Sequence, residues 1–389
     1  MLILVTGNIN SGKSFFIKRL RKELPLYAVA QIDKFRQKFG DGTQQGEEMA
    51  RSAFIDYVSS TEDVIAELSG LGPLGTMLAD NLPDKSCLIF WINECAEKCI
   101  ERLPYKDFKA IPYPSVVEKL EDTILRIDKE FNSGEFKNFW KNKAINIIEI
   151  NNDTEISKLP IMQYHYLNIV LKKLKSLSTI KEIIGYGSLA RNEMSALSDI
   201  DICAVTDLTL EDVKQALSET KELSYIDDLE GKVTLYFKNV LIEVVVVKEL
   251  KEIEWFYING NIKDANNSIL KGTKETAETL QQFIDNFKIN KQLEISKTTK
   301  RLNFYLRSLD RLAQGNDDYK YFFHTNIVIH ELVKLSAFYK GNFKYSYLPK
   351  QALREIDFDI KKAVYDFKKE KSEHLKELKQ LLNELPQMR

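Results

Sequence analysis

The chain has 389 residues, of which 44% are hydrophobic, enough for two or three domains with packed cores. Its charges nearly cancel, with a formal net charge of -1. A dedicated nucleic-acid-binding protein usually has a basic excess, so polynucleotide substrates are disfavoured, while tRNA stays open. Four cysteines without a second Cys pair or a neighbouring histidine favour reduced core thiols over a zinc site. We expect a cytoplasmic protein without a membrane partner, because no signal peptide and no apolar run of about 20 residues is found.

A phosphate-binding motif opens the chain. Residues 2–6 read as a short apolar strand, followed by the sequence GNINSGKS and a helical stretch. This is the pattern G-x-x-x-x-G-K-[ST] in the strand–loop–helix context that it requires. The N–H groups of such a loop bind phosphates, while its lysine reaches the terminal phosphates and its serine binds Mg²⁺. The residues expected to bind the nucleotide here are Gly7, Asn10, Ser11, Gly12, Lys13 and Ser14.

The stretch after this loop resembles small P-loop kinases of the nucleoside-monophosphate-kinase type, including the zeta-toxin-like branch. Strands alternate with helices up to residue 150, which predicts a mostly parallel sheet. Asp33 follows the second strand, where the resemblance implies a catalytic acid that contacts the acceptor hydroxyl; a helix N-cap is the alternative. Lys34 and Arg36 come next and are suited to an anionic acceptor.

Two further groups fit the same resemblance. Glu67 lies near the end of the third strand, at the place of an acid that orients the water shell of Mg²⁺; a surface acid is the alternative. Arg102, Lys106 and Lys109 resemble the basic lid residues that neutralise the transferring phosphate in these kinases. A solvated helix end is the alternative for these three cations.

A second motif lies in residues 183–205, IIGYGSLARNEMSALSDIDICAV. It reads as a strand, a Gly-Ser turn, a short helix and a second strand. Because side chains alternate along a strand, Asp199 and Asp201 project to the same side. Two adjacent carboxylates repel each other and provide the oxygen ligands that Mg²⁺ prefers. Gly187 and Ser188 bring backbone N–H groups and a hydroxyl close to the phosphates of a bound nucleotide.

A third carboxylate interrupts an apolar run. Residues 240–247 read VLIEVVVV, and Glu243 in such a buried strand needs a metal or a cationic partner. With the Gly-Ser turn and the Asp-x-Asp pair, it resembles the nucleotidyltransferase superfamily that includes DNA polymerase beta and the antibiotic nucleotidyltransferases; Arg191 and Ser198 also fit. The resemblance implies two Mg²⁺ ions on the three carboxylates, ATP or another NTP, and Glu243 as proton acceptor. A surface turn before a solvated acidic strand end is the alternative.

The pattern predicts an α/β P-loop domain, an α+β nucleotidyltransferase core and a C-terminal helical domain that shapes an acceptor or interaction site. The expected boundaries are 1–154, 155–270 and 271–389. Residues 326–349 resemble the helical region after the core of aminoglycoside and lincosamide nucleotidyltransferases. His324 and His330 are read as core or interface histidines in preference to acceptor contacts. The Lys/Glu-rich stretch 361–385 predicts a solvated helix packed through its leucines.

Together the motifs predict a bifunctional ATP-using enzyme. One centre transfers a nucleotidyl group, most simply AMP, to a hydroxyl of a small-molecule acceptor, and the P-loop centre transfers a phosphoryl group. One alternative is a nucleotidyltransferase of the toxin–antitoxin or phage-defence kind that modifies a protein or tRNA, with the P-loop domain as regulator. Another is a nucleotide-binding regulator without turnover, against which the intact Lys13 and three carboxylates argue. The acceptor, the preferred base and the oligomeric state stay open.

Overall fold

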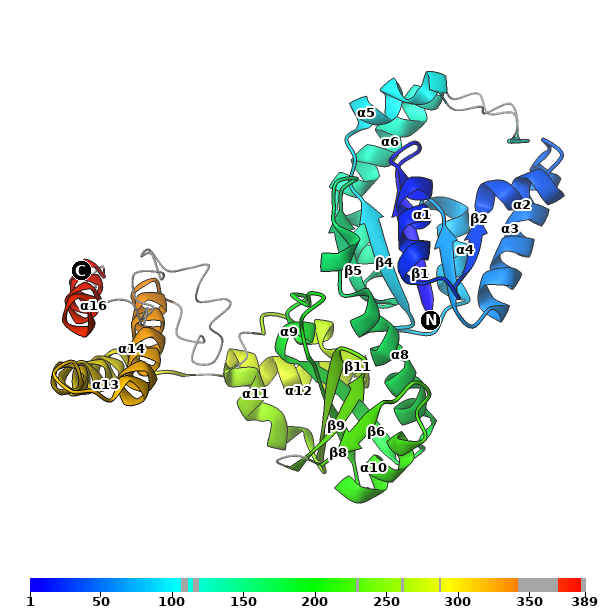
Figure 1. Cartoon of the computed structure of the whole chain (residues 1–389). Coiled ribbons are helices and arrows are strands. Elements are labelled where there is room, and N and C mark those ends of the chain that lie inside the picture. Colours follow the sequence, from blue (N-terminus) through cyan, green and yellow to red (C-terminus); the bar gives the residue numbers. More distant parts are fainter. Residues whose placement is uncertain are drawn as a thin grey trace. The chain divides into compact units, whose positions relative to one another are not determined.

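The structure is a computed structural model that describes residues 1–105, 111–114, 119–228, 231–259, 262–286, 288–341 and 370–385. The chain forms two compact units (Figure 1). The first comprises Met1–Glu249 and Asn266–Thr276, and the second comprises Leu250–Ala265 and Ala277–Arg389. Within the described residues, no helix combines the length and the apolar character needed to cross a membrane.

The first unit begins with a five-stranded sheet in the order β2-β3-β1-β4-β5, drawn in blue to green in Figure 1. All its neighbouring strands are parallel, which confirms the parallel sheet expected from the sequence. The strands are near-continuous apolar runs because both faces of such a sheet are covered. They are β1 (Leu2–Gly7), β2 (Ala28–Gln31), β3 (Val64–Glu67), β4 (Cys87–Ile92) and β5 (Ala144–Ile150).

Helices connect these strands and carry several of the candidate site residues on their first turns. Parallel strands need such crossovers, because a tight hairpin can join only antiparallel neighbours. The helices are α1 (Lys13–Glu23), α2 (Ile32–Phe39), α3 (Gln44–Ser60), α4 (Gly72–Asp80), α5 (Ala96–Glu101), α6 (Leu120–Asn132) and α7 (Glu135–Trp140).

A second, six-stranded sheet follows in the order β11-β6-β7-β10-β9-β8. Its central pair, β7 and β10, is parallel, while the other neighbouring strands are antiparallel. The strands are β6 (Ile180–Tyr186), β7 (Ile200–Thr206), β8 (Tyr225–Asp227), β9 (Lys232–Phe237), β10 (Val240–Val247) and β11 (Ile269–Lys271). The helices of this part are α8 (Ile161–Ser176), α9 (Gly187–Ala190) and α10 (Leu210–Ser218).

The two sheets share one hydrophobic core. A single cluster of buried side chains includes Ile3 and Phe16 from the P-loop part, Tyr164 from α8, and Ile202 and Val244 from the second sheet. Polar contacts cross the same junction, since the Tyr27 hydroxyl lies 2.6 Å from Nδ1 of His165. The expected boundary near residue 155 therefore separates two sheets but lies inside one compact unit.

The second unit is built from α11 (Glu254–Asn259), most of α12 (Lys274–Asp285), α13 (Lys291–Leu312), α14 (Asp318–Tyr339) and α16 (Lys371–Glu384). Leucines of α13, α14 and α16 form its apolar core, as the sequence period predicts. His324 is partly covered and packs edge-on against Tyr305, whereas His330 is exposed. Residues 342–349 and 361–369, which the sequence analysis included in its helical predictions, lie outside the described residues.

Candidate active sites

The P-loop connects β1 to α1 and depends on two glycines. Gly7 has φ +147° and Gly12 has φ +102°, a range that side chains rarely adopt. A Cβ on Gly7 would lie 2.8 Å from the carbonyl oxygen of Ile92, and one on Gly12 would overlap the side-chain amide of Asn152. The loop therefore fits closely against its surroundings and directs the N-terminus of α1, which has 11 residues, toward a phosphate site.

Lys13 and Ser14, the last two residues of the motif, make hydrogen bonds to the loop and to a neighbouring strand. The Lys13 ammonium donates to the carbonyl oxygens of Gly7 (3.1 Å) and Asn8 (2.6 Å), so it lies across the loop. The Ser14 hydroxyl donates to the Glu67 carboxylate at 3.0 Å. Glu67 is thus a partner of the motif serine, not an isolated surface acid. A hydroxyl beside a carboxylate fits Mg²⁺ by donor type, and the roles of both groups stay predictions.

Arg102 also lies against the loop. Its guanidinium donates to the Asn10 carbonyl oxygen at 3.0 Å and to the Glu94 carboxylate at 2.8 Å. Asn152 completes the network by donating to the Ser11 carbonyl oxygen at 3.0 Å and to Glu94 at 2.7 Å. Glu94 and Asn152 could not be found from the sequence, because a lone glutamate and an Asn-Asn-Asp turn carry no specific signal. Lys106 and Lys109 lie outside the described residues.

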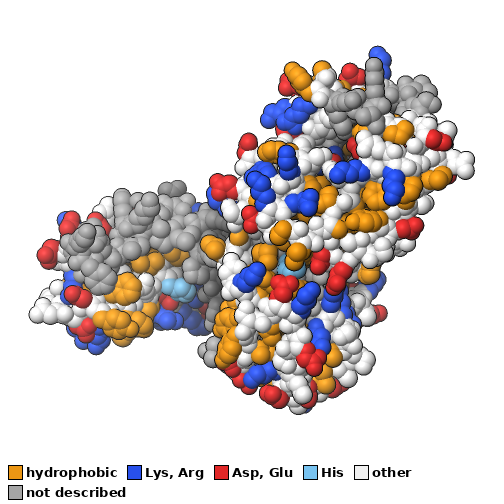
Figure 2. Space-filling model, turned by 45° about the vertical axis from the view of Figure 1, so that its right-hand side comes forward, with side chains coloured by type: hydrophobic (Ala, Val, Ile, Leu, Met, Phe, Trp, Pro, Cys, Tyr) orange, Lys and Arg blue, Asp and Glu red, His pale blue; other side chains and the backbone are white. Residues whose placement is uncertain are grey.

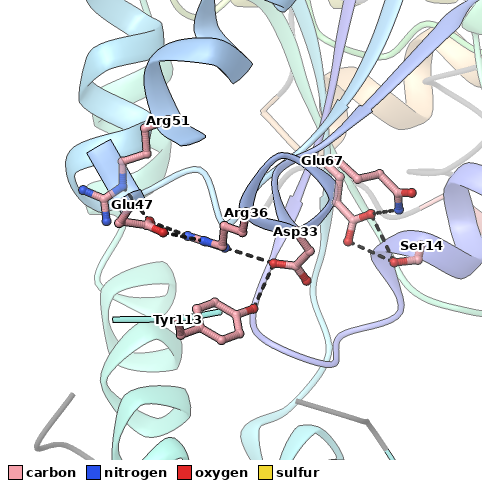
Figure 3. Close-up of polar contacts among 8 residues, drawn as sticks. Ser14, Asp33, Arg36, Glu47, Arg51, Glu67 and Tyr113 are labelled. Atoms are coloured by element: carbon pink, nitrogen blue, oxygen red, sulfur yellow. Dashed lines mark hydrogen bonds and ion pairs between the residues drawn. The ribbon is translucent and has the colours of Figure 1, made fainter. Parts of the chain in front are cut away.

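A cavity of about 820 Å³ opens beside the loop, and Lys13, Ser14 and Asp33 all line it. Asp33 lies in the first turn of α2, whose N-cap is Gln31, so the alternative role of Asp33 as that cap is wrong. One Asp33 oxygen accepts from the Tyr113 hydroxyl (2.9 Å) and from Arg36 (3.0 Å), as Figure 3 shows. Burial, and then the charge of Asp33, raise the pKa of Tyr113, so its hydroxyl stays protonated and donates.

A buried ion-pair network forms the far side of the cavity. Arg36 donates from Nε and Nη2 to the two oxygens of Glu47, both at 2.8 Å, and Arg51 donates to Glu47 at 2.7 Å (Figure 3). Glu47 is only 2% exposed. Burial alone would raise the pKa of Glu47, but its hydrogen bonds and charge attraction to the two arginines lower it overall. Glu47 and Arg51 lie one turn apart on α3, whereas Tyr113 belongs to the segment before α6, and no local motif marks them.

The second site is a row of side chains across four strands of the second sheet. Asp201 on β7 is the register partner of Glu243 on β10 and of Tyr186 on β6, while Thr234 on β9 pairs with Glu243. Register partners project to the same face of a sheet, so these four side chains lie side by side. Asp199 lies two residues before Asp201, at the entry to β7. The structure thus brings together carboxylates that are more than forty residues apart.

The Gly-Ser turn closes directly over this row. Gly187 has φ +60°, and a Cβ at this position would overlap the Asp201 carboxylate. Only a glycine lets the backbone approach that carboxylate so closely. The Ser188 hydroxyl is shielded from solvent and has no hydrogen-bond partner among the described residues. A buried unpaired hydroxyl beside clustered carboxylates is a feature that a bound polar ligand would satisfy.

The carboxylates of the row affect one another's ionisation. Burial, followed by the charges of Asp199 and Glu243, raises the pKa of Asp201 to about 7. Lys232 on β9 donates to Glu243 at 2.7 Å, a contact that the sequence did not predict. Within the described ranges, no three His, Cys, Asp or Glu side chains are arranged to hold a metal ion. Asp199 and Asp201 provide the oxygen donors that Mg²⁺ prefers, and a cation between them would relieve their mutual repulsion. Glu243 instead is oriented toward Lys232.

A comparison with protein families matches the part of the chain that contains the second site. Residues 167–271 match the model of the nucleotidyltransferase domain family, and this range contains all three carboxylates. No curated relative matches the chain. The chain is thus an enzyme whose nucleotidyltransferase domain follows a P-loop and a five-stranded parallel sheet.

Among solved structures, a gluconokinase from Sinorhizobium meliloti 1021 is 15% identical, with 39% of this chain and 83% of that chain covered and a TM-score of 0.28. A shikimate kinase from Acinetobacter baumannii is 16% identical, with 44% and 93% covered and a TM-score of 0.30. A nucleotidyltransferase-like protein from Exiguobacterium sibiricum 255-15 is 13% identical, with 57% and 74% covered and a TM-score of 0.28. TM-scores this low do not establish a shared fold.

Proposed function

We propose that the protein is a bifunctional, Mg²⁺-dependent transferase that uses ATP at two centres. The row of carboxylates transfers a nucleotidyl group, AMP in the simplest case, to a hydroxyl of a small-molecule acceptor. The P-loop centre transfers the γ-phosphoryl group to a second acceptor site beside Asp33. The observation that carries the proposal is the register of Asp201 with Glu243, directly beneath Gly187.

At the nucleotidyl-transfer centre, Asp199 and Asp201 would hold the metal, and Glu243, which accepts from Lys232 in this structure, would be the third ligand. Bound Mg²⁺ supplies charge neutralisation for the triphosphate. The N–H groups of the Gly187 turn and the Ser188 hydroxyl bind phosphate oxygens. The acceptor oxygen forms a bond to the α-phosphorus, the bond to pyrophosphate breaks, and Glu243 accepts the acceptor's proton.

At the P-loop centre, the loop N–H groups and Lys13 bind the β- and γ-phosphates, and Ser14 and Glu67 would hold the magnesium. Lys13 leaves the Gly7 and Asn8 carbonyl oxygens that it contacts in this structure and bonds to phosphate oxygens instead. Asp33 accepts the proton of the acceptor hydroxyl. At the same time, the hydroxyl oxygen of the acceptor bonds to the γ-phosphorus and ADP leaves.

A small-molecule acceptor is favoured by the charge distribution. Lys and Arg side chains are interspersed with Asp and Glu over the face shown in Figure 2, and the whole chain carries a net charge of -1. Binding of a polynucleotide relies on a concentrated basic surface. Modification of a protein or tRNA is the competing outcome of the experiment below.

The test is incubation with α-labelled and γ-labelled ATP over a panel of sugars, nucleosides, antibiotics, total tRNA and proteins. We expect each label to move to a small molecule. The α-label should disappear in Asp199→Ala, whereas the γ-label should disappear in Lys13→Ala. Label found on tRNA or on a protein would replace the small-molecule assignment. Transfer of α-label at the wild-type rate by Asp199→Ala would contradict the proposed nucleotidyl-transfer centre.

A further inference from the structure

The acceptor side of the P-loop cavity contains arginines that are already neutralised by carboxylates of the chain. Arg36 and Arg51 both donate to Glu47, and Arg36 also donates to Asp33, so two guanidiniums face two carboxylates. A third lining arginine, Arg126, pairs with Glu130 at 2.8 Å. All six side chains line the cavity. Among the described residues, each of the three arginines that line the cavity thus has an internal counter-ion.

The pairing through Glu47 is the one that a ligand could least easily displace. Its two oxygens receive three N–H donors at 2.7–2.8 Å, and the residue is 2% exposed. Withdrawing either arginine toward a bound phosphate would leave a buried carboxylate with fewer partners, which is strongly unfavourable. Arg36 also stacks over the Tyr113 ring, with its guanidinium carbon 4.8 Å from the ring centroid, which fixes it further.

The remaining lining that the structure describes offers little else for an anion. Apolar side chains line much of the described wall, among them Ile32, Leu71, Leu74, Pro114 and Ile127. Lys13 lies on the nucleotide side, where the phosphates of ATP occupy it. Lys34 is exposed and lines the same cavity. An exposed lysine gains little from an ion pair, because solvent screens its charge.

We propose that the P-loop cavity takes an uncharged, hydroxyl-bearing acceptor, and that Glu47 determines this selectivity by neutralising Arg36 and Arg51. The inference rests on the proposed phosphoryl transfer at this centre. It differs from the anionic acceptor that Lys34 and Arg36 suggest from the sequence. A neutral polyol or nucleoside would place its apolar face on the lining and one hydroxyl at Asp33, without displacing a buried ion pair.

The first test measures phosphate binding, so it requires no turnover. The full chain is saturated with Mg·ADP to fill the P-loop and titrated with inorganic phosphate by calorimetry. We expect wild type and the matched control Glu48→Gln, an exposed neighbour on α3, to behave alike. Glu47→Gln should gain a saturable phosphate site that is lost again when Arg51→Met is added. A folded Glu47→Gln variant that gains no site would overturn the role of Glu47.

A comparison of phosphate binding by wild type and Arg51→Met tests the inference even if Glu47→Gln does not fold. Equal phosphate binding by these two proteins supports a neutralised pocket. A wild-type phosphate site that disappears in Arg51→Met would show that Arg51 is available to anions and would overturn the inference. Phosphate bound at the nucleotidyl-transfer centre would be unchanged in both proteins and therefore would not mimic either outcome.

The second test compares acceptors that differ only by a phosphate, such as adenosine with AMP and ribose with ribose 5-phosphate. We expect γ-label transfer by wild type to favour the neutral member by at least about 10-fold in kcat/KM, and Glu47→Gln to reduce that ratio. Preference of wild type for the phosphorylated member would overturn the inference. Absence of any Lys13-dependent γ-phosphate chemistry would instead contradict the proposed function, and the phosphate titration would still report on the pocket.

Discussion

The P-loop and the carboxylate row, at which we propose that triphosphates bind, have opposite electrostatics. At the P-loop, the chain itself provides positive ends: backbone N–H groups, the N-terminus of α1 and Lys13. In the row, Asp199, Asp201 and Glu243 gather negative charge. Lys232 and Arg191 lower the pKa of Asp201, yet burial and the other two carboxylates outweigh them. The first site is complementary to phosphate as it stands, whereas the second becomes so with a divalent cation. The chain thus contains one candidate phosphate site made of positive groups and another made of negative groups.

The largest effect is expected from removing a carboxylate of the row. Asp201→Ala should reduce nucleotidyl transfer by at least about 10³-fold, because several kcal/mol of charge stabilisation in the transition state is lost with the metal. Phosphoryl transfer at the P-loop should stay within a few-fold of wild type. Single-turnover rates with α- and γ-labelled ATP measure both. Comparable losses of the two activities would mean that the sites are not electrostatically separate.

The converse change removes the cation of the P-loop. Lys13→Ala should lower γ-phosphoryl transfer by about 10²–10³-fold, since the loop N–H groups cannot replace a positioned positive charge. Binding of ATP to this centre should weaken, and α-label transfer should be unaffected. Lys18→Ala, an exposed lysine on the same helix, serves as the control. Persistence of γ-phosphate chemistry in Lys13→Ala would place that activity elsewhere in the chain.

Glu243→Gln sharpens the comparison, because it keeps the shape of the row while removing one charge. The chemical step should fall by about 10²-fold, the contribution of a positioned base, while Mg·NTP binding weakens only modestly. The amide also ends the charged contact with Lys232. Rapid-quench kinetics at saturating Mg·ATP separate the two effects. An unchanged single-turnover rate would remove Glu243 from the mechanism.

The smallest effect concerns the pH dependence of the unfolding free energy, which we expect to reflect the ion pairs of Glu47 beside the P-loop cavity. The arginines hold the pKa of Glu47 below its ordinary value of 4.5. The ionised Glu47 therefore stabilises the fold fully above pH 4.5, and this contribution is lost as the pH falls through the lowered pKa of the folded state. Glu47→Gln should reduce the free energy of unfolding by about 1–3 kcal/mol at pH 7. The difference from wild type should shrink as the pH falls below 4.5. Urea unfolding at several pH values measures this, and a difference that grew in acid would contradict the ion-pair assignment.

The sequence was informative wherever a residue's environment is local. The P-loop, the Gly187 turn and the Asp199–Asp201 spacing each occupy a few consecutive positions, so their geometry follows from local backbone structure. Glu47, Tyr113 and Lys232 could not be found in this way, because α3, the segment before α6 and β9 meet their partners only through packing and register.

The hydrophobic core that the two sheets share could not be predicted from the sequence either. The Asn-Asn-Asp turn at residues 151–153 indicates a break between two parts, and an apolar face on α8 does not reveal which sheet it covers. In the structure α8 contributes Tyr164 and Leu167 to a cluster that extends into both sheets. The boundary expected near residue 155 thus lies between the two sheets and within one compact unit.

The independence of the two centres is tested most directly by combining Lys13→Ala and Asp201→Ala in a double-mutant cycle, with α- and γ-label transfer followed in the same reaction. We predict that the loss of α-label transfer in Asp201→Ala is the same with or without Lys13, and that the loss of γ-label transfer in Lys13→Ala is the same with or without Asp201. If Lys13→Ala by itself abolished α-label transfer, the chain would contain one coupled centre in place of two, and the central claim would be contradicted.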